Sequence, residues 1–393
     1  MTALRKKIAF IRVYASVPIA RSVPRMLAAA FPEYAVETIT ITQLLKRRPD
    51  ILLLSSLHAV RTTGLRALEN SQALRKAALG TPYLFRQVRS LLRERLEKQR
   101  AEYVFSFQLQ SLFDASLPGL PHYVYTDHTH LANLQYAEFD RSQLNAHAWI
   151  ELEKSIYDNA DQIFTRSTNI SHSLIEQYGC PPEKVTCVYA GVNVPASEEP
   201  PDNDRYRNKK ILFVGIDWER KGGPQLVAAF RRVLKVHPDA QLLIVGCSPE
   251  VDLPNVQTFG KLPVEEVQRL YRQASIFCLP TRLEPFGIVF VEAMAHRLPI
   301  VATQIGAVPD MVIEGESGYL VEPDDIPALA ERLIDLLDDP QKSAHFGAAG
   351  YRLAQDRYNW KTVGEVLRRE ISARQPLPGS TQPPERLMPP IHA

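Results

Sequence analysis

Two glutamates with seven residues between them, Glu284 and Glu292, have the spacing and setting of a diol-binding pair. The apolar run 275–279 predicts a buried strand that ends at Pro280, and a helical pattern follows over about 287–297. The first amides of such a helix favour phosphate, because they are unpaired and lie at the positive end of the dipole. A carboxylate accepts two hydrogen bonds at once, which suits the vicinal hydroxyls of a ribose or a hexose. Together these features predict a nucleotide-sugar site.

The segment Glu284-Pro-Phe-Gly287, followed by Glu292, resembles the Glu-x7-Glu signature of retaining glycosyltransferases of the GT-B fold, family 4. The resemblance implies an α/β fold of two facing, doubly wound Rossmann-like domains with a cleft between them. It implies an enzyme that moves a hexosyl group from a nucleotide-diphosphate sugar to a hydroxyl acceptor and retains the anomeric configuration. It assigns a catalytic and donor-binding role to Glu284, and donor contacts to Phe286, Gly287, Ile288 and Glu292.

The segment from Gly215 to Gly223 predicts a phosphate cradle, because a strand, a glycine-bearing loop with two cations and a helix follow one another. It resembles the family segment whose Arg and Lys neutralise the donor diphosphate, with Gly215 beside the donor. Ile216 stands where many members have Arg, so the resemblance departs there. Lys221 keeps its place, and Arg220 is the candidate for the second charge at the leaving diphosphate. The alternative is a basic loop that caps a helix.

The stretch 258–263 resembles the family loop whose backbone contacts the base, which makes Lys261 and Leu262 further donor-binding candidates. The stretch 303–310 is similar to the family turn near the donor sugar. Because backbone contacts leave little trace in the choice of side chains, these two similarities predict where the segments lie. They say little about which groups contact the donor.

In the first half of the chain, a polar loop follows the apolar strand predicted over 122–126. Asp127 and His128 should therefore lie at that strand's carboxyl end, where open α/β sheets bind ligands. The resemblance implies that this loop faces the donor hexose and the acceptor, with His128 and Asp127 as catalytic candidates. His130 and Arg166 are acceptor-side candidates. The alternative for each of them is a polar group satisfied within its own loop or at the surface.

The alternation of strands and helices predicts two parallel, doubly wound units. We expect an acceptor-side domain over 1–195, a linker over 196–209 and a donor domain over 210–356. A helix over 357–373 should cross back to the first domain, and 374–393 should be a disordered Pro-rich tail. The expected strands of the two domains are 6–13, 51–54, 103–107, 122–126, 162–165 and 184–188, then 211–215, 242–245, 275–279, 299–302 and 318–321.

The first 100 residues carry 19 Lys and Arg against 6 Asp and Glu. Within them, residues 83–100 predict a basic amphipathic helix, which suggests contact with an anionic membrane surface. The alternative is that its apolar stripe packs on the core of the first domain while the arginines are solvated. The stripe consists of Leu84, Phe85, Val88, Leu91, Leu92 and Leu96.

Composition excludes several classes of protein. No apolar run reaches the 18 residues of a membrane span, and residues 1–7 show no signal peptide, so we expect a cytoplasmic protein, peripheral at the inner membrane face if the basic helix contacts lipid. The four cysteines have no metal or redox spacing. We expect no metal, no cofactor besides the nucleotide-sugar co-substrate, and no nucleic-acid partner. The acceptor hydroxyl belongs to a glycan, a lipid-linked molecule or a small molecule.

Three other functions compete with the transferase. A GT-B sugar-nucleotide epimerase would need no acceptor, and an inactive nucleotide-sugar-binding protein would agree with the departure at Ile216. A dinucleotide dehydrogenase is disfavoured, because no G-x-G-x-x-G follows the first strand of either unit.

Overall fold

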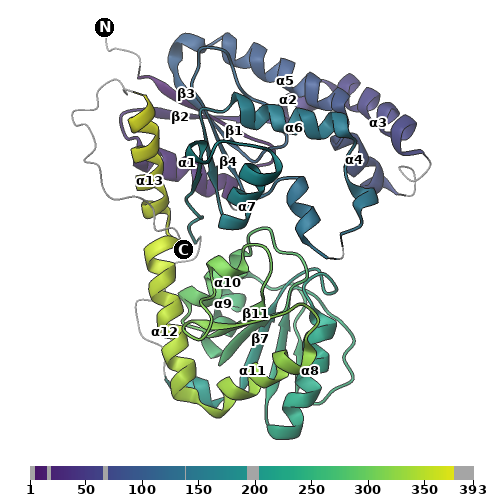
Figure 1. Cartoon of the computed structure of the whole chain (residues 1–393), viewed down its shortest axis with the longest axis vertical. Coiled ribbons are helices and arrows are strands. Elements are labelled where there is room, and N and C mark those ends of the chain that lie inside the picture. Colours follow the sequence, from purple (N-terminus) through teal and green to yellow (C-terminus); the bar gives the residue numbers. More distant parts are fainter. Residues whose placement is uncertain (1–4, 16–18, 65–69, 138, 193–202, 376–393) are drawn as a thin grey trace.

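The computed structural model describes residues 5–15, 19–64, 70–137, 139–192 and 203–375. It contains two α/β units, one above the other in Figure 1, joined along one side by α12 and α13. Each unit has a six-stranded sheet, with the orders β2-β1-β3-β4-β5-β6 and β12-β11-β10-β7-β8-β9. Since neighbouring strands pair in parallel throughout, the predicted pair of doubly wound Rossmann-like domains is confirmed.

The first unit surrounds its sheet with helices on both faces. Its strands are β1 (Lys7–Arg12), β2 (Ala35–Thr40), β3 (Tyr103–Leu109), β4 (His122–Thr126), β5 (Gln162–Thr165) and β6 (Val185–Cys187). Its helices are α1 (Ile19–Ala30), α2 (Ile41–Lys46), α3 (Pro49–Thr63), α4 (Ser71–Leu79), α5 (Pro82–Glu97), α6 (His147–Asn159) and the short α7 (Thr168–His172).

The strand expected over 51–54 is wrong, because these residues begin α3. Pro49 stands in the first turn of this helix, where its missing N–H costs nothing. The buried positions are Ile51, Ser55 and Ala59, which recur every four residues as on a helix face. The strand beside β1 is instead β2, whose alternating Val-Glu-Thr-Ile pattern predicts a strand only weakly.

The apolar stripe of α5 packs inside the first unit. Leu84, Phe85, Val88, Leu92 and Leu96 are all buried in one core cluster, together with residues of β1 and β4. Of the two expectations for 83–100, the surface helix packed on its own domain is therefore confirmed. Insertion of this apolar stripe into a bilayer is wrong, because a buried side chain cannot also contact lipid.

The second unit carries its strands close to the predicted positions. They are β7 (Lys210–Val214), β8 (Gln241–Val245), β9 (Val256–Thr258), β10 (Ile276–Leu279), β11 (Ile300–Thr303) and β12 (Gly318–Val321). The helices are α8 (Gly223–Val236), α9 (Val264–Gln273), α10 (Ile288–Ala295) and α11 (Ile326–Asp338). The edge strand β9, three residues long, is an addition to the prediction.

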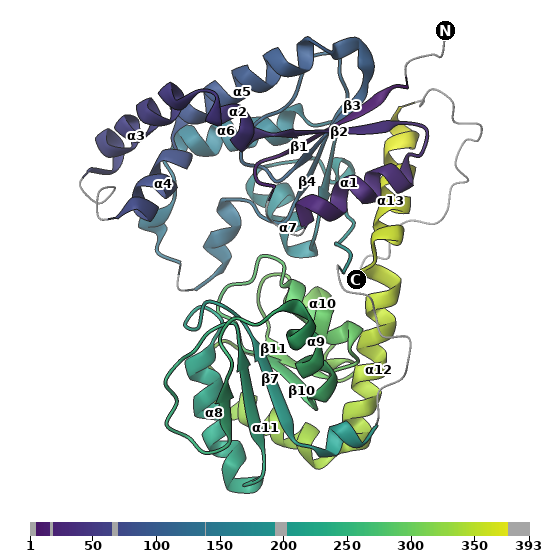
Figure 2. The same ribbon diagram turned by 180° about the vertical axis from the view of Figure 1, so that it is seen from behind.

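Two last helices connect the units. α12 (Pro340–Arg357) packs on α10, and α13 (Trp360–Arg374) packs against α1 of the first unit, as both views show (Figures 1 and 2). One Nη of Arg368 donates to the Ala30 carbonyl at 2.6 Å and lies 3.0 Å from Glu33. The chain thus returns to its first domain. Half of the predicted linker, at 196–202, and most of the predicted tail, at 376–393, lie outside the described residues.

Within the described ranges, none of the helices has both the length and the apolar character needed to cross a membrane.

Candidate active site

The donor-side candidates gather where the strand order of the second sheet reverses. β7 and β10 are neighbours at its centre, and their following loops lead to α8 and α10 in opposite directions along the sheet. A crevice outside the carboxyl ends of two such strands is the usual ligand site of an open α/β sheet. The two sequence motifs, the cradle after β7 and the Glu284 loop after β10, therefore meet at one place.

Lys221 and Glu284 form a buried ion pair across this crevice. Lys221 is 9% exposed and Glu284 is 4% exposed. Burial lowers the pKa of Lys221, and the charge of Glu284 acts in the opposite direction. Gly222 makes the approach possible, because it adopts φ +74° and a Cβ there would collide with the Pro280 carbonyl.

Arg220 lies beside the pair and points to the first unit. Its guanidinium donates to the Leu283 carbonyl at 2.8 Å and bonds the carboxylate of Asp217 at 3.0 Å. It lines a hollow of about 290 Å³ to which Tyr136 of the first unit also contributes. Ile216, at the position where many family members have Arg, is 73% exposed. Arg220 therefore remains the candidate for the second cation of the cradle.

Glu292 lies in the second turn of α10, behind the helix start at Gly287. Its Oε2 accepts a hydrogen bond from the buried Tyr271 hydroxyl at 3.2 Å. Burial raises the pKa of Glu292 to about 7, while the Tyr271 hydroxyl lowers it. The imidazole of His296 donates to the Glu292 carbonyl at 2.8 Å and closes the helix. The Tyr271 hydroxyl thus orients the carboxyl of Glu292 in the second turn of α10.

The remaining donor-side candidates surround this crevice. Phe286 is buried, with its ring 6.4 Å from that of Tyr358, and Ile288 is half-buried at the start of α10. Lys261 is exposed and Leu262 is half-buried. Their loop is tied to the end of β8, because the Gly246 amide donates to the Gly260 carbonyl at 2.7 Å.

Gly215 at the end of β7 touches this neighbouring loop. A Cβ at Gly246 would lie 2.6 Å from the Gly215 carbonyl oxygen, so the two backbones are in close contact. The turn over 303–310 is joined to the other side of the crevice, since the Ala307 amide donates to the Glu284 carbonyl at 3.3 Å. The structure therefore brings all the predicted donor-side segments together.

On the first unit, Asp127 and Arg166 form an ion pair of 2.9 Å at the carboxyl ends of β4 and β5. Arg166 is 4% exposed, and its guanidinium lies over the Tyr125 ring at 5.0 Å. Its Nε and Nη2 are buried without a hydrogen-bond partner among the described residues. A surface role for Arg166 is therefore wrong.

His128 lies on the same loop and lines a hollow of about 160 Å³ with Asp127, His130 and Trp149. Its Nε2 accepts from the side-chain amide of Asn133 at 3.1 Å, which places the proton on Nδ1. This Nδ1 is buried and has no partner within the part of the chain that the structure describes. Burial lowers the pKa of His128, although the charge of Asp127 raises it. The neutral imidazole is thus a hydrogen-bond donor at neutral pH.

His130 is used inside the first unit. Its Nε2 accepts from the Asn145 amide at 2.8 Å, and its ring stands edge-on to Trp149 at 5.2 Å. Its own amide donates to the buried carboxyl of Glu153 at 3.0 Å. The side chain therefore orders the wall of the hollow, in agreement with the alternative of a satisfied loop residue.

Two contacts between the units have no signature in the sequence. Tyr136 is 5% exposed, and its hydroxyl lies against the backbone of Glu284. Burial and the charge of Glu284 raise the pKa of this phenol. The carboxylate of Asp310 accepts from the amide and the hydroxyl of Thr168 at 2.7 and 2.6 Å. Both contacts depend on how the units face each other, so a linear pattern does not reveal them.

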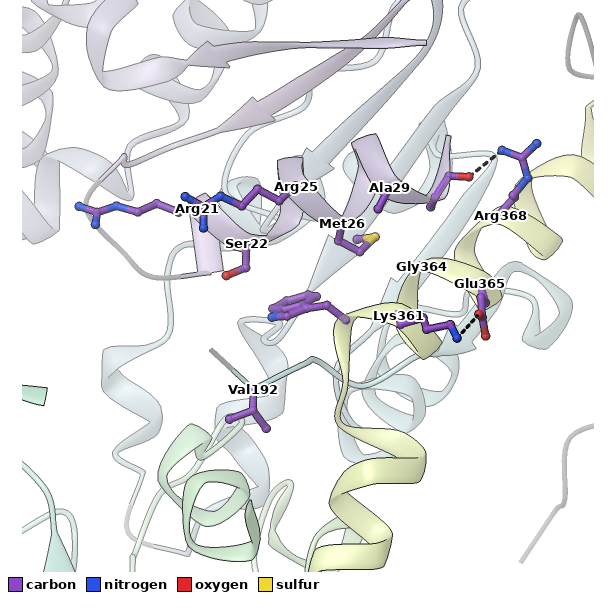
Figure 3. Close-up of a pocket in the computed structure, with 12 residues that line it drawn as sticks. Arg21, Ser22, Arg25, Met26, Ala29, Val192, Lys361, Gly364, Glu365 and Arg368 are labelled. Atoms are coloured by element: carbon purple, nitrogen blue, oxygen red, sulfur yellow. Dashed lines mark hydrogen bonds and ion pairs between the residues drawn. The ribbon is translucent and has the colours of Figure 1, made fainter. Parts of the chain in front are cut away.

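A separate hollow of about 790 Å³ lies between α1 and α13 (Figure 3). Met26, Ala29 and Trp360 form its apolar part, and Arg21 and Arg25 extend along its rim (Figure 3). It shares no lining residue with the hollows at Arg220 or His128. The hollow belongs to the crossing of the last helix and is distinct from those two hollows.

Family profiles match both units. The one for "Glycosyltransferase Family 4" covers residues 70–196, and the one for "Glycosyl transferases group 1" covers residues 197–353. The chain belongs to the group 1 glycosyltransferases.

Two curated relatives come from corynebacteria. A GDP-mannose-dependent monoacylated alpha-(1-6)-phosphatidylinositol monomannoside mannosyltransferase of Corynebacterium glutamicum is 36% identical over 164 residues, 38% of this chain and 43% of that protein. A D-inositol 3-phosphate glycosyltransferase of Corynebacterium diphtheriae is 27% identical over 242 residues, 55% of this chain and 56% of that protein. The chain spans about half the length of these curated relatives.

Among solved structures, sucrose-phosphate synthase from Thermosynechococcus elongatus has a similar fold. The TM-score is 0.66 at 21% identity, and the match covers 92% of this chain and 97% of that one. This likeness shows the GT-B fold.

Proposed function

We propose that this protein is a retaining glycosyltransferase that moves a hexosyl group from a nucleotide-diphosphate sugar to a hydroxyl acceptor. The observation that carries the proposal is the buried Lys221–Glu284 pair at the switch point of the second sheet. An ammonium in this place, at the start of two helices, suits a diphosphate better than any neutral ligand. Membership of the group 1 glycosyltransferases supports the same chemistry.

On the donor side, Lys221 and Arg220 neutralise the diphosphate, and its negative charge grows as the bond to the sugar breaks. Glu284 holds the ammonium in place before the donor binds, so little reorganisation is needed in the transition state. Glu292 accepts hydrogen bonds from the ribose hydroxyls. In this proposal two side-chain cations and helix amides stabilise the negative charge of the diphosphate, and no metal ion is required.

On the acceptor side, His128 donates from Nδ1 to the transferred hexose, and Asp127 holds Arg166 beside it. The bond between the anomeric carbon and the phosphate oxygen breaks, and the acceptor oxygen bonds to the same face of the sugar. The acceptor proton passes to the leaving phosphate oxygen. No protein nucleophile takes part, and configuration is retained.

We further propose that the acceptor hydroxyl is carried by a lipid-linked molecule and that the protein works at the inner face of a membrane. The C. glutamicum relative is named for a phosphatidylinositol mannoside, which supports a lipid-linked class. The basic first hundred residues suit an anionic surface. The epimerase and the inactive binding protein are not favoured, because both family profiles are those of transferases.

The test begins with thermal stabilisation of the purified chain by a panel of nucleotide sugars that includes GDP-mannose and UDP-glucose, since a ligand of the folded state raises its apparent stability. The stabilising donor is then incubated with lipid extracts, with and without EDTA, and the product linkage is determined by NMR. We expect an EDTA-resistant product with the donor's anomeric configuration. An inverted linkage, or free sugar released without an acceptor, would reject the proposal.

A further inference from the structure

Helix α3 presents large apolar side chains to solvent. Leu53 is 65% exposed, Leu57 54%, Leu54 43% and Leu52 40%. Leu53, Leu54 and Leu57 lie within about 100° of one another around the helix, and Leu52 lies beside them at about 100° from Leu53. We call these four residues the leucine face of α3. Single exposed apolar residues are ordinary on a protein surface, whereas a cluster of this kind marks a site of association.

The opposite side of α3 explains why the leucines face outward. It buries Ile51, Ser55 and Ala59, of which only the first is large. The Ser55 hydroxyl donates to the Ala78 carbonyl at 2.8 Å and lies 2.6 Å from the Thr81 hydroxyl. These buried hydrogen bonds fix which side of the helix faces the domain. A rotation of the helix by half a turn would bury the leucines instead. The buried hydrogen bonds of Ser55 oppose that rotation, so the leucines stay exposed.

The surroundings of the leucine face are basic. Lys46, Arg47 and Arg48 come directly before α3 and are exposed, and Arg61 is exposed in its last turn. The one acidic residue of α3, Asp50, is already paired with Arg48 at 2.8 Å. An apolar face rimmed by cations suits an anionic partner. A second copy of the chain would bring the same cations against one another, so self-association through this face is disfavoured.

The position of α3 suits an extended planar partner. It lies at the outer end of the first unit with α4 and α5, at the opposite end from α13, in both views (Figures 1 and 2). α2 and α3 follow the carboxyl end of β2 in the chain. Since the sheet is parallel, this is the same edge that carries the His128 loop at the end of β4.

We propose that the leucine face of α3 docks the protein on an anionic lipid bilayer. Leu53 and Leu57 enter the boundary between head groups and acyl chains, while Arg47 and Arg61 contact the head groups. The purpose of this contact rests on the proposed lipid-linked acceptor, but the binding itself needs no donor and no catalysis. It places the membrane contact on α3, in place of the apolar stripe of α5.

The experiment is co-sedimentation of the full chain with vesicles of pure phosphatidylcholine and with vesicles that contain phosphatidylglycerol. We expect binding to the anionic vesicles only, weakened at high salt. Leu53→Glu with Leu57→Glu should lower the partition coefficient at least about tenfold, since it removes apolar contact and adds negative charge. Arg47→Ala and Arg61→Ala should each lower the partition coefficient about fivefold. Val264→Glu, at a valine that is 60% exposed on α9, is the matched control and should change nothing.

Calorimetric binding of a nucleotide sugar checks the fold of each variant. Leucine-face variants that keep donor binding and lose vesicle binding support the proposal. Equal binding to neutral and anionic vesicles, or binding that survives both glutamates, would overturn it. A dimer in light scattering that the glutamates dissolve would assign the face to a second copy. Vesicle binding without any donor binding would instead count against the proposed function and leave the docking face standing.

Discussion

The two sides of the cleft differ in how completely their buried polar groups are paired. On the donor side, Lys221 is paired with Glu284, and Glu292 with the Tyr271 hydroxyl. On the acceptor side, His128 and Arg166 keep buried nitrogen atoms without partners among the described residues. An unsatisfied buried donor costs about 1–3 kcal/mol. The donor side is thus assembled before its ligand arrives, while the acceptor side retains hydrogen-bonding capacity that a substrate can satisfy.

This contrast leads to a general expectation for how variants change donor binding and the rate of transfer. Substitutions on the donor side should change donor binding, because they break interactions that already exist. Substitutions of the unpaired groups should leave donor binding intact and lower the rate of transfer.

The largest effect is expected for Lys221→Ala, which removes the buried cation of the cradle. We predict that kcat falls on the order of 10²–10³-fold, because the lost charge faces the diphosphate as its charge develops. Steady-state kinetics with the stabilising donor measure this. Lys342→Ala is the control, since Lys342 forms a more exposed ion pair with Asp335, between α11 and α12. A change in KM alone would mean that Lys221 binds substrate and transition state equally.

A second effect concerns pH and the two buried carboxyls, Glu153 in the first unit and Glu292 in the second. Burial raises the pKa of each to about 7 from 4.5. The folded state therefore holds protons that the unfolded state releases between pH 4.5 and 7. The stability that these groups contribute is fully present below pH 4.5 and is lost as pH rises through about 7. The free energy of unfolding falls by about 3 kcal/mol per carboxyl over this range.

Chemical denaturation from pH 5 to pH 8 measures the slope of the unfolding free energy against pH. Glu292→Gln should flatten it and raise stability at pH 8. Glu153→Gln should also flatten it but destabilise the fold at every pH, because both oxygens of Glu153 accept hydrogen bonds and an amide offers only one acceptor. Equal behaviour of the two variants would contradict the difference between the two carboxyls, since that of Glu153 accepts three hydrogen bonds and that of Glu292 accepts one.

A third prediction is that Glu292→Gln weakens donor binding by roughly 1.5–3 kcal/mol, the value of a hydrogen bond to a charged group. Because the carboxylate is the better acceptor, donor affinity of the unchanged protein should rise with pH through about 7. Calorimetry at pH 6 and pH 8 tests both statements. Glu265→Gln on the exposed first turn of α9 is the control. Unaltered affinity in Glu292→Gln would remove this residue from the donor site.

The smallest effect is expected for His128→Gln. It removes the donor at the position of Nδ1, because the glutamine amide lies nearer the position of Nε2. The value of kcat/KM should therefore fall about tenfold, as for one hydrogen bond of 1–1.5 kcal/mol. Donor affinity should stay within about twofold of the original, in contrast to Glu292→Gln. His345→Gln, at an exposed histidine of α12, provides the comparison. A loss of donor binding in His128→Gln would show that the acceptor side also holds the donor.

The sequence alone was enough to predict which segments of the second unit lie together. The strands of the second unit are short apolar runs, and each motif lies in the loop between such a strand and the following helix. Because these loops connect consecutive elements, the positions of Lys221, Glu284 and Glu292 depend on local chain geometry. The order of the parallel sheet then brings them together.

Only the tertiary structure decided the rest. Residues 51–54 are apolar enough for a strand, yet the buried hydrogen bonds of Ser55 hold them in α3 with their leucines outward. The apolar stripe of α5 was equally suited to a bilayer and to a core, and the neighbouring sheet determined which it contacts. Tyr136 meets Glu284 only because two units far apart in sequence face each other. In each case the deciding contact is long-range, and hydrophobic periodicity records that a side chain can be buried without recording what covers it.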